Sequence, residues 1–92
     1  MTDTTSTMTM QITVRYFAAA RAAAGVEADK VQVPSTATVA DLLDAIRAEH
    51  GPELTRVLAR CSYLLDEVAV RDKGTPVADA TSLDVLPPFA GG

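Results

Sequence analysis

One stretch of this chain has the apolar spacing of a helix that must be covered on one side. Its large apolar residues recur at i, i+3, i+4 and i+7, at Val39, Leu42, Leu43 and Ile46. This spacing places them on one helix face. Thr38 and Asp41 form a variant of the capping box that starts a helix, and Gly51 and Pro52 stop it after residue 50. Because no second long helix is available, this apolar face predicts packing on a β-sheet.

Strand patterns supply the sheet that this helix needs. Residues 10–17 alternate between apolar and polar side chains, which is typical of a half-buried strand. Further short strands are expected at 30–34, 61–65, 68–70 and 82–86. In the last of these, Leu83 and Val85 should face the core, and Asp84 should face out or towards a partner. The order of elements predicts an α+β domain in which one main helix packs on one face of the sheet.

Two shorter segments are expected to be helices that are weak on their own. Residues 18–24 are mostly alanine, the strongest helix former, and Gly25 suits the position after a helix end. Pro52 fits the first turn of a helix over 52–60. The inner face of that helix is Leu54, Val57 and Leu58. Residues 71–80 have no periodicity and are expected to be irregular.

The length of 92 residues fits one domain, and no repeat or linker divides the chain. Residues 1–9 are rich in Thr and Ser and are expected to be a disordered leader. Residues 10–88 form the expected domain, and residues 89–92 are expected to be a flexible tail that ends in diglycine. A domain of this size buries only about 60% of its unfolded surface. Its core is therefore too small to enclose a deep active site.

Charge and cysteine content exclude several classes of function. The formal net charge is −4 and no basic stripe is present, so the chain is not expected to bind nucleic acid. No apolar stretch approaches the length of a membrane span, so no membrane association is expected. Cys61 is the only cysteine, which excludes an intrachain disulfide and a cysteine metal cluster. This cysteine content is compatible with a reducing compartment, and a cytoplasmic location is expected.

No side chain has the partners that catalysis or metal binding requires. The sequence lacks a glycine-rich phosphate loop, a pair of supported carboxylates and metal-ligand spacing. His50, the only histidine, lies at the expected C-terminal end of the long helix, where a capping or surface role is expected. Cys61 lacks the arrangement of a nucleophile and is expected to be a small buried residue. No metal and no stably bound cofactor are expected.

The most distinctive segment is the end of the chain, with Pro87, Pro88, Phe89, Ala90, Gly91 and Gly92. Proline fixes φ and carries no backbone N–H, so the two prolines end the last strand and stiffen its exit. The four residues beyond them reach about 14 Å when extended, enough to enter a partner's pocket. The two glycines have no Cβ, so their backbone can pass a constriction. The terminal carboxylate of Gly92 is left unhindered as a chemical group.

A terminal carboxylate becomes reactive only after activation. Attack on a free carboxylate must expel oxide, whereas an acyl-adenylate formed with ATP has a good leaving group. A sulfur donor can then convert the adenylated Gly92 into a thiocarboxylate, which is a soft nucleophile carried on a protein. The chain is therefore interpreted as a carrier or substrate whose working group is its own C-terminus, and not as an enzyme by itself.

Several segments together resemble a known family. They are 11–18, Arg21, Gly25, 38–43 and 83–92. They resemble the ubiquitin-like sulfur-carrier family, and within it the small subunits of molybdopterin synthase, over residues 10–92. The double proline before a short step and the diglycine is the most specific feature, because related carriers for thiazole synthesis usually lack the proline pair. The chain departs from the family in two places. Residues 22–24 are alanines where many relatives have a charged stretch, and the leader is additional.

The resemblance implies a β-grasp fold, a ubiquitin-like mixed sheet packed on one main helix. It also implies two partners in succession. On a ubiquitin-activating-type adenylyltransferase, which consumes the ATP, Gly92 would be adenylated and thiocarboxylated. On the large subunit of molybdopterin synthase, in a heterotetramer, the tail would enter a pocket and its sulfur would pass to cyclic pyranopterin monophosphate. The resemblance assigns partner contacts to Pro87, Pro88, Phe89, Ala90 and Gly91.

Two alternatives remain open from the sequence. One is a sulfur carrier for another product, thiazole or cysteine, which uses the same terminal chemistry. The other is a ubiquitin-like modifier, in which Gly92 would end in an amide bond to lysines of target proteins. The proline pair favours the molybdopterin synthase subunit over both.

Overall fold

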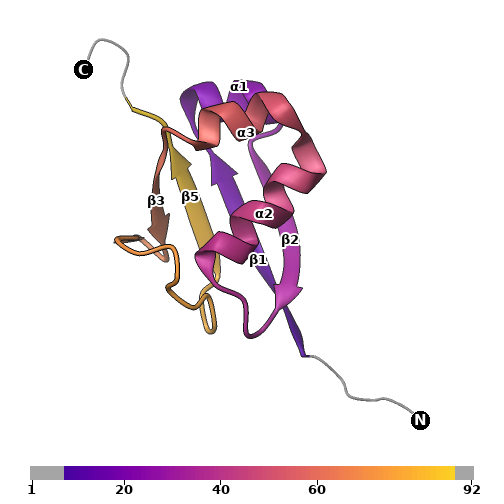
Figure 1. Ribbon diagram of the computed structural model, residues 1–92, viewed down its shortest axis with the longest axis vertical. Helices are drawn as coiled ribbons and strands as arrows, with labels where there is room; N and C mark the ends of the chain where they lie inside the picture. The colour runs from indigo at the N-terminus through magenta and orange to yellow at the C-terminus, as the bar shows by residue number, and fades with distance from the viewer. Residues whose placement is uncertain (1–7, 89–92) are drawn as a thin grey trace.

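The alternation of polar and apolar residues near the N-terminus forms a strand inside a mixed sheet. The computed structural model describes residues 8–88. In order, its elements are β1 (Thr9–Tyr16), α1 (Ala18–Ala24), β2 (Ala28–Pro34), α2 (Val39–His50), α3 (Pro52–Leu58), β3 (Ser62–Leu65), β4 (Val68–Ala69) and β5 (Ser82–Leu86). The strand order is β2-β1-β5-β3-β4, with β1 and β5 parallel and the other neighbours antiparallel (Figure 1). The predicted α+β class, a mixed sheet on one main helix, is confirmed.

Helix α2 begins and ends where its sequence predicted. The backbone N–H of Asp41 donates to Thr38 Oγ1 at 3.3 Å, and the backbone N–H of Thr38 donates to Asp41 Oδ2 at 2.9 Å. These two bonds complete the capping box. Gly51, with a φ of 88°, follows the last residue of α2. Figure 1 shows α2 crossing one face of the sheet, with α1 and α3 at one end of it.

The buried face of α2 is the face that the spacing predicted. Val39, Leu42 and Leu43 are 0% exposed and Ile46 is 1% exposed. The sheet contributes side chains to the same core at Ile12, Val14, Tyr16, Val33, Leu83 and Val85. Burial of apolar surface stabilises by roughly 25 cal/mol per Å², so the contact between α2 and the sheet stabilises the domain.

Two expected segments fall partly or wholly beyond the described residues. β1 begins at Thr9, the last residue of the expected leader, because Thr9 still pairs with β2. Met8 also takes part, since its carbonyl accepts the backbone N–H of Ser35 at 2.8 Å. The rest of the expected leader, residues 1–7, and the expected tail, residues 89–92, lie outside the described residues.

The remaining boundaries lie within two residues of the predictions. β2 begins at Ala28, because its pairing with β1 continues to Arg15. Val33 is buried as expected, whereas Val31 is only half-buried, since β2 is an edge strand. Other ends shift slightly: α3 ends at Leu58, β3 begins at Ser62 and β4 ends at Ala69.

The segment between β4 and β5 is irregular, as predicted, but it contributes to the core. Val77 is 0% exposed, and its backbone N–H donates to the carbonyl of Ala37 at 3.0 Å. Next to it, Pro76 forms an isolated bridge with Thr38. The segment thus packs beside the start of α2. The sequence did not reveal this, because one apolar residue in an irregular segment has no periodicity.

Replacing Ile46 with alanine should lower the free energy of unfolding by about 2–5 kcal/mol, because a fully buried side chain would leave a cavity. Urea unfolding followed by circular dichroism measures this loss. Glu49→Ala, on the exposed side of the same helix, is the control and should change stability by no more than about 0.5 kcal/mol. Equal losses for the two variants would contradict the register of α2.

Candidate functional site

Strand β5 carries the chain out of the sheet toward the predicted functional segment. It pairs parallel with β1 and antiparallel with β3, so both of its edges are hydrogen-bonded. Its inner side chains, Leu83 and Val85, are 0% exposed. The strand ends at Leu86, and Pro87 is half-buried while Pro88 is exposed. The other predicted site residues lie outside the described residues: Phe89, Ala90, Gly91 and Gly92.

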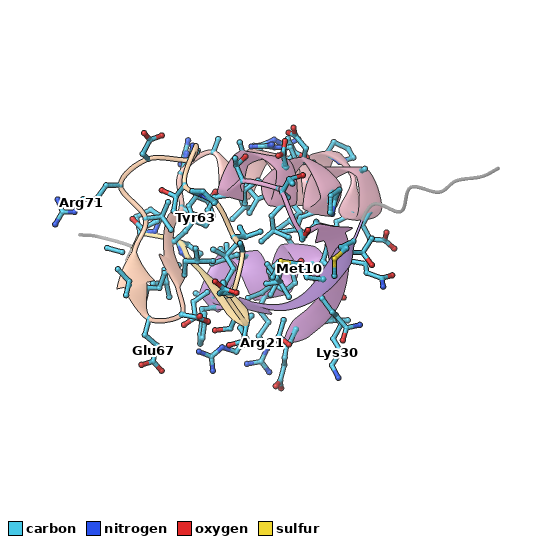
Figure 2. All side chains as sticks on the ribbon, turned by 90° about the horizontal axis from the view of Figure 1, so that it is seen from below. Met10, Arg21, Lys30, Tyr63, Glu67 and Arg71 are labelled. Carbon is cyan, nitrogen blue, oxygen red and sulfur yellow. The ribbon has the colours of Figure 1, made fainter. Side chains whose placement is uncertain are left out.

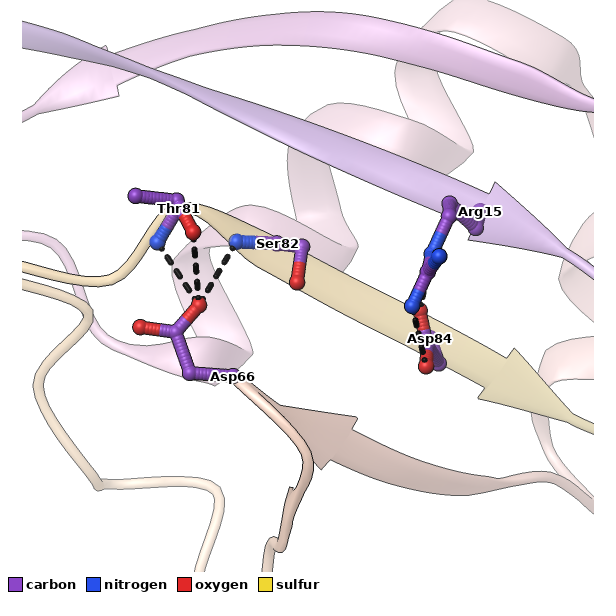
Figure 3. Close-up of polar contacts among 5 residues, drawn as sticks. All are labelled: Arg15, Asp66, Thr81, Ser82 and Asp84. Carbon is purple, nitrogen blue, oxygen red and sulfur yellow. Dashed lines mark hydrogen bonds and ion pairs between the residues drawn. The ribbon is translucent and has the colours of Figure 1, made fainter.

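The start of β5 is held by a turn in the neighbouring hairpin. Asp66 Oδ1 accepts the backbone N–H of Thr81 at 2.9 Å, the hydroxyl of Thr81 at 2.9 Å and the backbone N–H of Ser82 at 3.0 Å (Figure 3). These hydrogen bonds stabilise the ionised carboxylate, so they lower the pKa of Asp66 below its ordinary value. Asp66 and Glu67 both have positive φ, as a two-residue hairpin turn requires. The turn between β3 and β4 therefore anchors the first residues of β5.

The middle of β5 is held by an ion pair on the face of the sheet opposite α2. The strand register places Arg15 of β1 directly beside Asp84. Arg15 donates from Nε to Oδ1 at 2.6 Å and from Nη2 to Oδ2 at 2.9 Å (Figure 3). The Asp84 side chain is only 9% exposed, whereas that of Arg15 is 46% exposed. The carboxylate also raises the pKa of Arg15, so the guanidinium stays charged.

The expectation that Asp84 faces out of the core is confirmed, although Arg15 shields it from solvent. Asp84 does point away from the core, because it alternates with Leu83 and Val85 along the strand. It is nevertheless buried, since Arg15 lies against it. The sequence could not show this contact, because the two residues are 69 positions apart.

The end of β5 lies beside an exposed aromatic residue. The backbone N–H of Phe17 donates to the carbonyl of Val85 at 3.2 Å, which continues the pairing of β1 and β5 beyond the end of β1. Phe17 is 40% exposed. On the other side of β5, Leu86 pairs with Ser62. The residues that lead to the tail are thus held between two strands, at the end of the sheet near α1 and α3 (Figure 1).

The described residues do not bring together a metal centre. Within residues 8–88, no three His, Cys, Asp or Glu side chains are placed to hold a metal ion. Cys61 is half-buried, and its Sγ donates to the carbonyl of Val57 at 3.3 Å. Burial raises the pKa of the Cys61 thiol, which makes it a weak nucleophile. In the same part of the chain, no helix has both the length and the apolar character to cross a membrane.

His50 has a structural partner that the sequence did not reveal. Its Nε2 lies 2.5 Å from Asp29 Oδ2, the same oxygen that accepts the hydroxyl of Tyr16 at 3.0 Å. The rings of His50 and Tyr16 meet edge to face, with 5.6 Å between their centroids. His50 lies at the C-terminal end of α2, as expected. It links that helix to the edge strand β2 and is not a plain surface residue.

Comparison with known proteins identifies the family to which this chain belongs. The sequence profile of the ThiS family matches residues 14–92, which include most of the domain and the C-terminal segment. The chain belongs to the ThiS family. A molybdopterin synthase sulfur carrier subunit from Chlamydomonas reinhardtii is 36% identical to this ThiS-family chain over 84 residues, which are 90% of the chain and 100% of the relative.

Solved structures resemble the chain over most of its length. The crystal structure of SAMP1 from Haloferax volcanii has a TM-score of 0.79 at 30% identity, with 90% of this chain and 100% of that chain covered. A protein–protein complex of subunits 1 and 2 of molybdopterin-converting factor from Helicobacter pylori contains a chain with a TM-score of 0.64 at 25% identity, with 90% and 100% covered. These likenesses confirm the ubiquitin-like β-grasp fold of this ThiS-family member and the resemblance found in its sequence.

Asp66→Asn should lower the melting temperature at neutral pH, because a neutral amide accepts the bonds from Thr81 and Ser82 more weakly than a carboxylate does. The folded pKa of Asp66 is depressed, so its stabilising effect is present above about pH 4, the pKa of an unfolded Asp. The effect is lost as the pH falls through the lower folded pKa. The difference from the wild type should therefore shrink in acid.

Thermal unfolding between neutral pH and strong acid measures this difference. Glu67→Gln is the control, because Glu67 lies in the same turn without those hydrogen bonds. A pH-independent difference for Asp66→Asn, or an equal one for the control, would contradict the assignment.

Proposed function

We propose that this chain is a sulfur carrier that delivers sulfur from its own C-terminus during molybdenum cofactor biosynthesis. The observation that carries the proposal is the course of the last strand. β5, bonded on both edges, leads directly into Pro87 and Pro88, and residues 89–92 complete the sequence with a diglycine. The relative from Chlamydomonas reinhardtii, named a molybdopterin synthase sulfur carrier subunit, supports this role.

The proposed reaction uses the terminal carboxylate in two steps. A carboxylate oxygen of Gly92 attacks the α-phosphorus of ATP, which forms an acyl-adenylate and releases pyrophosphate. A sulfur donor equivalent to hydrosulfide then attacks the acyl carbon, and AMP leaves. The product is a thiocarboxylate in which one terminal oxygen of Gly92 is replaced by sulfur. The first step needs the carboxylate oxygen within roughly 3–3.5 Å of phosphorus, which an unhindered terminal glycine allows.

The proposed partners supply the catalytic side chains. A ubiquitin-activating-type adenylyltransferase would hold the ATP and perform the activation. The large subunit of molybdopterin synthase would then accept the loaded tail and transfer its sulfur to cyclic pyranopterin monophosphate, in a heterotetramer. The complex of subunits 1 and 2 of molybdopterin-converting factor from Helicobacter pylori supports the second partnership. The small core of this chain is consistent with chemistry that is performed elsewhere.

The residues before the terminus would aim it. Pro87 and Pro88 limit the directions in which the tail can leave β5, because each fixes φ. Phe89 would pack at the mouth of the partner's channel, and Ala90 and Gly91 would lie in its narrow part. Phe17, which is 40% exposed at the same end of the sheet, offers a further apolar contact near the root of the tail.

A ubiquitin-like modifier is the second candidate. It is favoured by the likeness to a protein named small archaeal modifier protein 1 from Haloferax volcanii. In that case the acyl-adenylate of Gly92 would be consumed by lysine amines of target proteins, and the product would be an amide. Carriers for thiazole or cysteine would share the thiocarboxylate and differ only in the molecule that accepts the sulfur.

The chain should gain one sulfur at Gly92 when it is incubated with its cognate adenylyltransferase, ATP and a sulfur donor. Intact-mass and fragment-ion spectrometry measure the gain and its position. Gly92→Ala should keep the melting temperature of the wild type and fail at adenylation, because the added Cβ blocks the channel. One extra residue after Gly92 should also abolish loading, since it moves the carboxylate by about 3.5 Å.

Cys61→Ser is the matched control and should load sulfur normally, because no step uses that thiol. Sulfur found on Cys61 as a persulfide would contradict the proposal. So would a Gly92→Ala variant that supports dithiolene formation at the wild-type rate with the large subunit and pterin. Conjugates to lysine in place of a thiocarboxylate would favour the modifier.

A further inference from the structure

Asp84 lies at an unusual place for a buried carboxylate. Among residues 8–88 it is the only buried charged residue, and it points to the face of the sheet opposite to Leu83 and Val85. Removing a carboxylate from water costs free energy, and an apolar residue of similar volume often stabilises a fold equally well or better. The burial of Asp84 therefore has a weak explanation in stability alone.

The guanidinium of Arg15 keeps an unused edge. Arginine has five N–H donors, and Asp84 occupies the Nε hydrogen and one hydrogen of Nη2. No other hydrogen-bond partner of Arg15 is found among residues 8–88. The side chain is 46% exposed, and the edge formed by Nη1 and Nη2 is the part of the guanidinium that Asp84 does not occupy. Two parallel N–H groups on such an edge match a carboxylate.

The surroundings of Arg15 hold a second cation as well as an anion. Lys30, which is exposed, pairs with Thr13, so it lies diagonally beside Arg15 on the same face of the sheet. Figure 2 shows Lys30 and Glu67 pointing away from α2 and α3. Glu67 acts on Arg15 through space but makes no hydrogen bond to it. A carboxylate bound at Arg15 would therefore have Lys30 as a second cation on the same face of the sheet.

The position of Arg15 relative to the tail indicates a role for the unoccupied edge of its guanidinium. Asp84 precedes Pro87 by three residues, a distance of about 10 Å along an extended strand. A partner that grips only the tail leaves the domain free to rotate about it. A directional contact through Arg15, about 10 Å along the strand from Pro87, would prevent that rotation. Asp84 already holds the guanidinium in one orientation.

We infer that Arg15 is a specificity-determining residue, whose outer edge binds a carboxylate on the large synthase subunit while Asp84 holds the guanidinium in place. This inference rests on the proposed function, because it takes that subunit as the partner. Arg15 would select partners that carry a carboxylate at the matching position, since an apolar surface there would leave the guanidinium without an acceptor.

The test measures binding of the unloaded chain to the cognate large subunit by calorimetry. Arg15→Gln combined with Asp84→Asn removes both charges and leaves no charge buried alone. Its dissociation constant should rise at least about tenfold, with little change in melting temperature. Arg15→Lys should also bind weakly, because an ammonium that pairs with Asp84 has no second edge. The matched control is Asp44→Asn with Arg47→Gln, an ion pair of the same residue types on α2, which should bind like the wild type.

The results separate a failure of this inference from a failure of the proposed function. Wild-type affinity in the Arg15 and Asp84 double variant, or in a folded Arg15→Lys, would overturn the inference while leaving the proposed function intact. An equal loss in the Asp44 and Arg47 control would also overturn it, because the removal of any ion pair of this chain would then have the same effect. A wild-type chain that does not bind the large subunit would contradict the proposed function itself, and with it this inference.

Discussion

The parallel pairing of β1 with β5 is the contact on which the rest of the fold depends. It joins a strand near the start of the domain to the strand that ends it, so all the other elements lie in the connection between them. Parallel neighbours need such a crossover, because a short turn cannot reverse the chain twice. Helix α2 belongs to this connection and covers the inner face of β1 and β5. The additional pairing of β5 with β3 on its other edge places β5 in the centre of the sheet.

The register of that pairing decides both faces of the sheet at once. Val14 lies beside Leu83 in the core, and Arg15 lies beside Asp84 on the other face. A slip of one residue in either strand would turn its charged side chain toward α2 and its apolar neighbours toward water. The ion pair thus penalises the wrong register even where it adds little to the free energy of folding. This is a physical reason for two charges to lie in the middle of a small sheet.

The same arrangement explains how so small a domain can serve a group-transfer reaction. Strand β5 is held at its start by Asp66, in its middle by Arg15 and at its end by the N–H of Phe17. A strand that is hydrogen-bonded along its whole length fixes the point from which Pro87 and Pro88 leave the sheet. Under the proposed function, the domain contributes position and recognition, while its partners contribute the catalytic groups. The thiol of Cys61 donates to the carbonyl of Val57 in α3 and has a raised pKa, so it is a weak nucleophile.

The sequence by itself determined the elements and the nature of the candidate site. The spacing of Val39 to Ile46, the alternation in β1 and the capping residue Thr38 are local signals, because each depends on neighbours within one or two turns. The proline pair and the diglycine are equally local, so they pointed directly to the end of the chain that the proposed function uses. Only the tertiary structure decided that Arg15 covers Asp84, that His50 reaches Asp29 and that Val77 enters the core. These contacts join residues far apart in the chain, and they depend on strand register and helix placement, which no local pattern of side chains specifies.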